Sequence, residues 1–217
     1  SIAIAAGYRV VAYTSPHIEN YNERIRINGL MAADETICKA FMQIETVREP
    51  ETLTYFEYGT LAVLKIIMEQ QPDLVLLEVG LGGRLDAVNC VDPDVAIITS
   101  IGIDHVDWLG ETRAEIALEK AGIGRSDKPM ICGESEPPTE LLEYCVREQI
   151  PLVRSGIDYQ INTGRNDWSL DYSQKQYCLA GIPKPIMAGE HQISNLAAAL
   201  VALHQLDDIR INREQII

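Results

Sequence analysis

The chain has 217 residues, 47% of them hydrophobic, so it can bury a substantial core, and a single domain is the first expectation. Its 18 basic and 32 acidic residues give a formal net charge of −14, which argues against broad contact with nucleic acid or an anionic membrane. No apolar stretch approaches the roughly 20 residues of a membrane span, and the first residues do not form a signal peptide. We therefore expect a cytoplasmic protein.

The five cysteines are an odd number, without a close pair at metal-ligand or redox spacing. We expect them to be reduced and mostly structural. Cys90 lies near a glycine-rich loop and is the cysteine with the best case for a functional role.

The first thirty residues predict a helix end, a strand and a long loop. Residues 1–6 resemble the last turns of a helix that Gly7 stops, and residues 8–13 form a strand that Pro16 closes. The polar connection at 18–30 is too long for a simple turn, and loops of this length are usually functional or disordered.

Two capping boxes mark helix starts. Thr54 with Glu57 begins a helix that continues to about residue 70, and Thr112 with Glu115 begins one that ends at Gly122. The spacing of apolar residues and other start signals predict further helices at 34–48, 139–149, 193–206 and from 212–215.

Short, unbroken apolar runs at 74–77 and 95–99 are typical of strands covered on both faces. With strands at 129–132 and 152–153, they alternate with the helices and predict an α/β fold with a mostly parallel sheet flanked by helices. Short alternating segments between about 156 and 187 predict a small antiparallel β appendage.

Three strands end in Ser15, Glu78 and His105. The carboxyl ends of parallel strands form the usual ligand-binding edge, and an acid, a hydroxyl and an imidazole there suggest a divalent metal site. Magnesium prefers oxygen ligands, and a histidine in the set is unusual for it, so manganese is an alternative. The residues alone leave other interpretations open: His105 as a strand cap, and Glu78 as the partner of Arg84.

The glycines at 80, 82 and 83 resemble a dinucleotide fingerprint only superficially, because Leu85 occupies the third glycine position and no acid ends the next strand. They are better explained by a close approach of the backbone to a ligand, with Arg84 and Asp86 beside it.

Lys120 and the start of the alanine-rich helix are two further candidate sites, and each also has a purely structural explanation. Lys120 lies late on a helix, where the helix dipole stabilises a cation. His191, Gln192 and Asn195 lie at the start of an alanine-rich helix, which suits an anion or a nucleotide base as well as simple capping.

Seven strings carry a resemblance to one family. They are YTSPH at 13–17, ERIRING at 23–29, TYFEYGTL at 54–61, LEVGLGGRLDA at 77–87, DHVDWLG at 104–110, EKAGI at 119–123 and GEHQISN at 189–195. In this order they are similar to folylpolyglutamate synthase/dihydrofolate synthase, of the Mur-ligase superfamily. The resemblance extends over nearly the whole chain and implies the P-loop NTPase-like central domain of that superfamily over residues 1–217.

The resemblance implies roles for individual residues. It makes Ser15, Glu78 and His105 the magnesium ligands, with His105 and Lys120 catalytic and Lys120 present as a carbamate. His17 and Asp104 would support the metal site as neighbours of its ligands. Asn195, with His191 and Gln192, would contact ATP. The substrate-binding residues implied are Thr54, Tyr55, Phe56, Glu57, Arg84, Leu85 and Asp86.

The implied activity is an ATP-dependent amide ligase that adds L-glutamate to dihydropteroate or to a folyl-glutamate. ATP converts the acceptor carboxylate to an acyl phosphate, which the glutamate amine attacks. Thr-Tyr-Phe-Glu favours the bifunctional bacterial form, and the family's members are usually monomeric. The alternatives are another Mur-superfamily amino-acid ligase and a pterin- or nucleotide-binding module without chemistry.

The family's P-loop with its lysine and its smaller C-terminal domain have no counterpart in this sequence, and we expect both outside residues 1–217. Because the loop positions the transferred phosphate, the 217-residue chain alone is expected to be inactive.

Overall fold

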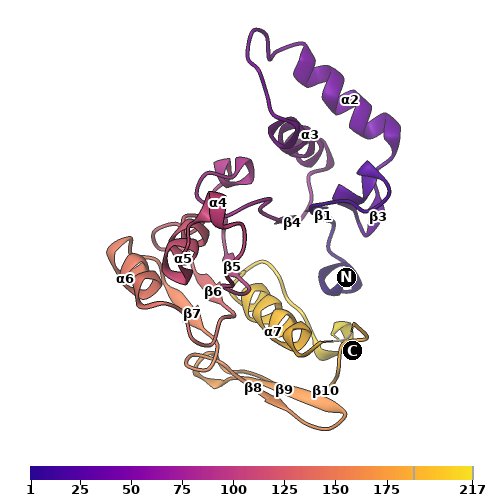
Figure 1. Ribbon diagram of the computed structural model, residues 1–217. Helices are drawn as coiled ribbons and strands as arrows, with labels where there is room; N and C mark the ends of the chain where they lie inside the picture. The colour runs from indigo at the N-terminus through magenta and orange to yellow at the C-terminus, as the bar shows by residue number, and fades with distance from the viewer. Residues whose placement is uncertain (188, 217) are drawn as a thin grey trace. The chain divides into compact units, whose positions relative to one another are not determined.

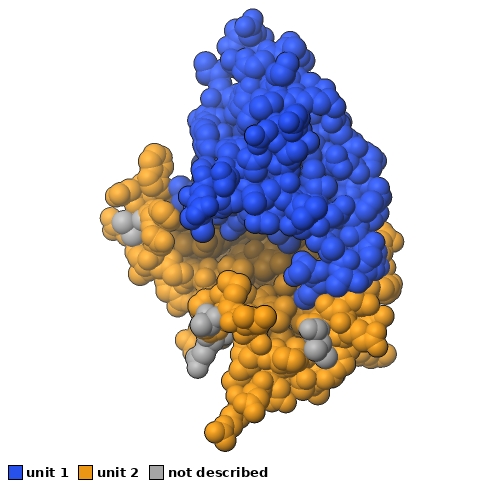
Figure 2. Space-filling model, turned by 90° about the vertical axis from the view of Figure 1, so that its right-hand side faces the viewer, with its two compact units in different colours: residues 1–81, 85–91 blue, residues 82–84, 92–217 orange. Residues whose placement is uncertain are grey.

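The computed structural model describes residues 1–187 and 189–216 and divides the chain into two compact units. The first comprises residues 1–81 and 85–91, and the second comprises residues 82–84 and 92–217 (Figure 2). The chain enters the second unit for residues 82–84 of the glycine-rich loop, returns to the first unit, and passes finally into the second after residue 91. Among the helices described, none is long and apolar enough to cross a bilayer.

A four-stranded mixed sheet forms the base of the first unit. Its spatial order is β3-β2-β1-β4, and only β1 and β4 are parallel to each other. The strands are β1 (Val10–Tyr13), β2 (Ile25–Ile27), β3 (Leu30–Met31) and β4 (Leu74–Leu77).

The expectation of a loop without regular structure at 18–30 is wrong. This segment forms the 3₁₀ helix η1 (Tyr21–Arg24), then β2, and then a tight turn into β3. Asn28 and Gly29 make that turn with φ angles of 50° and 85°. An Asn-Gly pair between apolar residues is a strong local hairpin signal, and it identifies this turn.

Two helices pack together in the first unit, α2 (Asp34–Glu45) and α3 (Tyr55–Gln70) (Figure 1). The capping box predicted at the start of α3 is confirmed. A short helix, α1 (Ile2–Ala5), precedes β1, as the sequence predicted. The core joins the helices to the strands and contains Val11, Tyr13, Ile25, Ile37, Ala40, Val63 and Ile66.

The second unit is built on a parallel sheet of β5 (Ala96–Ile98), β6 (Met130–Cys132) and β7 (Leu152–Arg154). The helices α5 (Arg113–Ala121) and α6 (Thr139–Arg147) pack on one face of this sheet, and α7 (Glu190–His204) packs against β5 and β6 on the other (Figure 1). The predicted parallel sheet flanked by helices is therefore confirmed. The helix α7 begins three residues earlier than its apolar spacing predicted.

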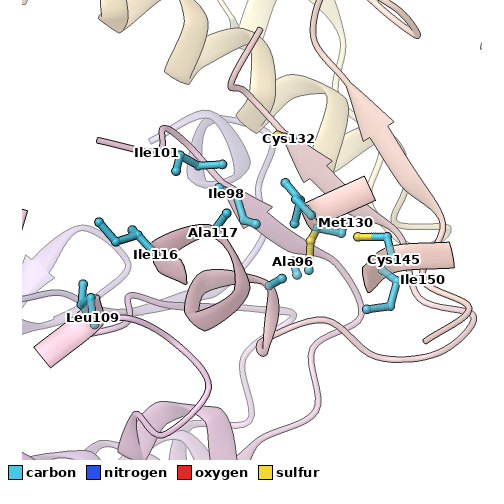
Figure 3. Packing of buried hydrophobic residues seen from close by; sticks show 12 residues of the cluster. Ala96, Ile98, Ile101, Leu109, Ile116, Ala117, Met130, Cys132, Cys145 and Ile150 are labelled. Carbon is cyan, nitrogen blue, oxygen red and sulfur yellow. The ribbon is translucent and has the colours of Figure 1, made fainter. Parts of the chain in front are cut away.

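Figure 3 shows the apolar cluster between this sheet and helices α5 and α6. Met130 and Cys132 of β6 are fully buried against Leu141 and Cys145 of α6. Burial raises the pKa of the Cys132 thiol, and it raises that of Cys145 to about 11, so both are protonated at neutral pH. These two cysteines are structural, as predicted, whereas Cys90 is exposed.

The predicted antiparallel appendage is also confirmed. It consists of β8 (Gln160–Thr163), β9 (Asp167–Tyr172) and β10 (Tyr177–Pro183), in the order β10-β9-β8. Alternate residues of β9 are buried and α7 packs against this strand, so the appendage shares the core of the second unit. The remaining short helices are α4 (Val106–Leu109), η2 (Ala87–Cys90), η3 (Ser173–Lys175) and η4 (Arg213–Gln215).

Candidate functional site

Ser15 and Glu78 lie side by side in the first unit, directly after two parallel strands. Tyr13 of β1 is in register with Leu77 of β4, and the Glu78 amide donates to the Tyr13 carbonyl at 2.9 Å. The Ser15 amide in turn donates to Glu78 Oε2 at 2.8 Å. Hydroxyl and carboxylate oxygens are donors that magnesium accepts, so the residue types that meet at these strand ends fit the predicted metal.

His105 belongs to the second unit, at the start of the short helix α4. Its carbonyl accepts from the amides of Trp108 and Leu109, and its own amide donates to Asp104 Oδ1 at 2.7 Å. The Asp104 carboxylate is also 3.8 Å from His105 Nε2. The φ angle of His105 is 52°, a left-handed conformation that costs energy in a residue other than glycine and is concentrated at functional sites.

In residues 1–187 and 189–216, no group of three or more His, Cys, Asp or Glu side chains is arranged to hold a metal ion. The predicted set contains two residues of these types, Glu78 and His105, with Ser15 as the third ligand. This set stays a prediction.

Asp86 shapes the glycine-rich loop from within the first unit. Its Oδ2 accepts from the amides of Gly80 and Leu81, at 2.9 and 3.0 Å, while Oδ1 accepts from Val88 at 2.9 Å and caps η2. A carboxylate with three amide donors is rigidly placed, so Asp86 has a structural role whatever it binds. Leu85, predicted to contact substrate, is 79% exposed and accessible.

The predicted substrate segment 54–57 opens α3 in the same unit. The Thr54 amide donates to Glu57 Oε2 at 2.7 Å, which lowers the pKa of the Glu57 carboxyl, and the Glu57 amide donates to Thr54 Oγ1 at 3.3 Å. Phe56 lies directly against Gly80, where an added Cβ would be 2.6 Å from the ring. The structure therefore brings Phe56 to the glycine-rich loop and leaves Tyr55 63% exposed.

Residues 82–84 of the glycine-rich loop dock on the end of α5 in the second unit. The Arg84 guanidinium makes two hydrogen bonds, of 2.9 and 2.8 Å, to Glu119 Oε1, and the Arg84 amide donates to the Glu119 carbonyl at 2.8 Å. Lys120, predicted to be catalytic, is the next residue of α5 and lies in its last turn. The loop and Lys120 are thus held together by Glu119.

Gly83→Ala is expected to disturb this docking. An added Cβ at residue 83 would lie 2.8 Å from the Glu119 carbonyl oxygen and 2.8 Å from Ile123 Cγ2, and backbone cannot yield as a flexible side chain does. The free energy of unfolding, measured by urea denaturation, should fall by about 1–3 kcal/mol. Gly102→Ala is the control, because its Cβ would meet no atom within 4 Å; equal effects of the two variants would contradict the prediction.

The predicted nucleotide contacts lie in the first turns of α7. Gln192 Nε2 is 3.1 Å from His191 Nε2, and the His191 ring lies close to Gly189, whose φ is 120°. Asn195 is half-buried one turn further along the helix. The helix is 15 residues long, so its amino end carries the partial positive charge that suits an anion.

The loop that follows Ser15 is ordered by Glu23. Its carboxylate accepts from the amides of Ile18, Glu19 and Asn20, at 2.9, 2.9 and 2.7 Å. These bonds stabilise the ionised form and lower the pKa of Glu23 from its ordinary value of 4.5 to about 2.

This pKa shift predicts a pH-dependent stability. Because the folded-state pKa is depressed, the contribution of Glu23 is complete above pH 4.5 and is lost as the pH falls to about 2. The melting temperature of the parent should exceed that of Glu23→Gln at neutral pH, and the difference should shrink across this window. Glu19→Gln, which changes a neighbouring exposed carboxylate, is the control; a difference that is constant with pH would contradict the prediction.

Two residues of these surroundings were not predicted from the sequence, Arg24 and Glu119. Arg24 is only 8% exposed, and its Nε donates to His17 Nδ1 at 2.8 Å. Both residues lie within strings that carry the family resemblance, ERIRING and EKAGI, which is the one sequence signal that could have identified them.

Comparisons with known proteins agree with this fold. A family model described as the Mur ligase middle domain matches residues 27–203. The dihydrofolate synthase/folylpolyglutamate synthase of Escherichia coli (strain K12) is 44% identical over 198 residues, covering 91% of this chain and 46% of that protein. The chain spans about half the length of the curated relatives it matches.

Two solved structures are closely similar. E. coli FolC in complex with DHPP and ADP has a TM-score of 0.93 at 42% identity, covering 100% of this chain and 50% of that chain. The bifunctional folylpolyglutamate synthase/dihydrofolate synthase of Yersinia pestis, complexed with AMPPNP and Mn ion, has a TM-score of 0.90 at 40% identity, covering 99% and 50%. Because the family model matches well over half of its residues, the chain belongs to the Mur ligase middle domain family.

Proposed function

We propose that this chain provides the nucleotide-binding middle domain of an ATP-dependent ligase that adds L-glutamate to dihydropteroate, to a folyl-glutamate, or to both. The observation that carries the proposal is the juxtaposition of Ser15 and Glu78, two residues with oxygen side chains, at the ends of two parallel strands of a Mur ligase middle domain. The E. coli relative, whose structure holds DHPP and ADP, supports the choice of substrates.

In this proposal the acceptor carboxylate attacks the terminal phosphorus of ATP, ADP leaves, and the glutamate amine then displaces phosphate from the acyl phosphate. The residues that would hold a divalent cation, magnesium or manganese, are Ser15, Glu78 and His105, and the bound cation would neutralise charge on the phosphates. The Y. pestis relative, described with AMPPNP and Mn ion, supports manganese as an alternative.

The other residues bind and position the substrates. Thr54, Phe56 and Leu85 form the pterin wall, with the backbone of the glycine-rich loop against Phe56. The start of α7, with Asn195, His191 and Gln192, receives the nucleotide. Lys120 is carried as a carbamate, which turns its cation into an anion; the added carbon dioxide is detectable by native mass spectrometry.

The test is ADP release by the purified protein that carries this chain, with ATP, magnesium and L-glutamate, adding dihydropteroate in one assay and tetrahydrofolate in the other. Release with both establishes a bifunctional synthase, and release with tetrahydrofolate alone a monofunctional one. Absence of glutamate-dependent release in both assays overturns the proposal. Pterin titration without ATP then identifies a binding module, and its failure returns the question to other amino-acid ligases of the superfamily.

The proposal also includes a monomer in the cytoplasm. Sedimentation equilibrium of the same protein tests the oligomeric state.

A further inference from the structure

Arg24 is a buried cation in the first unit, with aromatic rings against its guanidinium. The residue is 8% exposed, and its Cζ lies 5.8 Å from the centroid of the Tyr21 ring and 5.6 Å from that of Tyr55. Its Nε donates to His17 Nδ1 at 2.8 Å. Burial of a charge is costly unless it is compensated, and here the ring faces and the imidazole nitrogen compensate it.

Hydrogen bonds to the neighbouring backbone fix the positions of Arg24 and His17. The Thr14 amide donates to the Arg24 carbonyl at 2.8 Å, immediately before Ser15. At the other side, the Glu23 carboxylate binds the amide of Ile18, which follows His17. The Thr14–Arg24 backbone bond therefore joins the two ends of the segment from Ser15 to Arg24, and the Arg24–His17 bond links side chains within it.

The hydrogen bond determines which imidazole nitrogen carries the proton. Because Nδ1 accepts from the Arg24 Nε–H, the ring hydrogen of neutral His17 is on Nε2. His17 is half-buried and follows Ser15 by two residues, at the carboxyl end of β1. It therefore offers one N–H donor of fixed identity next to a predicted metal ligand.

We propose that His17 donates a hydrogen bond from Nε2 to an oxygen of the acceptor carboxylate or of the phosphate transferred to it, and that Arg24 is the residue that positions it. This inference rests on the proposed ligase function. A positioned donor stabilises the negative charge that develops on these oxygens, whereas a mobile ring must be ordered during the reaction. Arg24 acts through His17 and contacts no reacting atom.

Two substitutions of His17 test the roles of its two ring nitrogens separately. In His17→Asn the amide oxygen can replace Nδ1 as the acceptor for Arg24, but no donor remains at the position of Nε2. In His17→Gln a donor near the position of Nε2 is kept and the acceptor for Arg24 is lost. We expect His17→Asn to keep the parental melting temperature and to lose at least about tenfold in kcat, and His17→Gln to keep more of kcat.

Arg24 is tested through its dependence on His17. Arg24→Gln should lower kcat while leaving KM for ATP unchanged, and it should cause no further loss in a variant that already carries His17→Ala. Arg26→Gln is the matched control, because Arg26 lies two residues further along the chain, in β2, where it is exposed and donates to the Gly29 carbonyl at 3.2 Å. Full additivity of the two changes, or equal kcat in His17→Asn and the parent, overturns the inference.

A second measurement does not depend on activity. The imidazole ¹⁵N shifts of the purified protein that carries this chain, recorded at about pH 8 where free imidazole is neutral, report the tautomer of His17. We expect the proton on Nε2, with a mixture of tautomers in Arg24→Gln. A proton on Nδ1 in the parent overturns the inference, even if ligation is demonstrated; an expected tautomer in a protein without ligase activity removes the proposed function and the catalytic role of His17 with it.

Discussion

If the protein is the ligase proposed above, Glu78→Gln is expected to lower the rate of ATP-dependent ligation by about a hundredfold or more, because a bound divalent cation supplies several kcal/mol of charge stabilisation in phosphoryl transfer. Glutamine keeps an oxygen that can accept from the Ser15 amide, which the carboxylate does at 2.8 Å, so the strand ends should stay together. The measurement is glutamate-dependent ADP release as a function of magnesium concentration, and the magnesium required for half-maximal rate should rise.

Asp73→Asn is the matched control for this prediction. Asp73 is the acidic residue at the opposite end of β4, where it pairs with Arg9 at 2.8 Å. The two variants remove the same charge from the same strand and differ in which end loses it. Equal magnesium dependence in the parent and Glu78→Gln would exclude Glu78 as a ligand.

Leu141→Ala is expected to destabilise the second unit strongly. Leu141 is fully buried in α6 and packs in the cluster that joins α5 and α6 to the parallel sheet. Removing its methyl groups loses apolar burial and leaves a cavity, which together cost about 2–5 kcal/mol in the free energy of unfolding. Urea denaturation followed by far-ultraviolet circular dichroism measures this change.

Val146→Ala on the same helix is the control, since Val146 is 80% exposed and its truncation leaves no cavity. Its effect should stay within about 0.5 kcal/mol. If both variants unfold at the same urea concentration, α6 does not depend on the cluster for its stability.

Local sequence signals predicted most of the helices and strands, because the residues that make up each signal act on backbone only a few residues away. The capping boxes at Thr54 and Thr112 start helices in the structure as they do in the sequence. The segment 18–30 was mispredicted although its signals are equally local: a capping box at Asn20 and Glu23, and the Asn28-Gly29 turn. Its strands have three and two residues, too short for their alternation to be recognised.

The candidate site also has features that the sequence predicted and features that only the structure revealed. The sequence placed Ser15 and Glu78 after apolar runs, and parallel pairing of β1 with β4 brings them together. It assigned no partner to Arg24 and left Glu78 as a candidate partner for Arg84. The structure pairs Arg84 with Glu119, 35 residues away, and places Arg24 against His17 and the rings of Tyr21 and Tyr55.

The sequence by itself determined the class of fold, the positions of most helices and strands, and the family resemblance, because these depend on local periodicity, caps and ordered strings. Only the tertiary structure decided which charges are paired and which are buried. A charged side chain has the same local pattern whether it meets water, a carboxylate or a ring. The burial of Arg24 depends on residues from η1 and from the start of α3, and only folding brings them together.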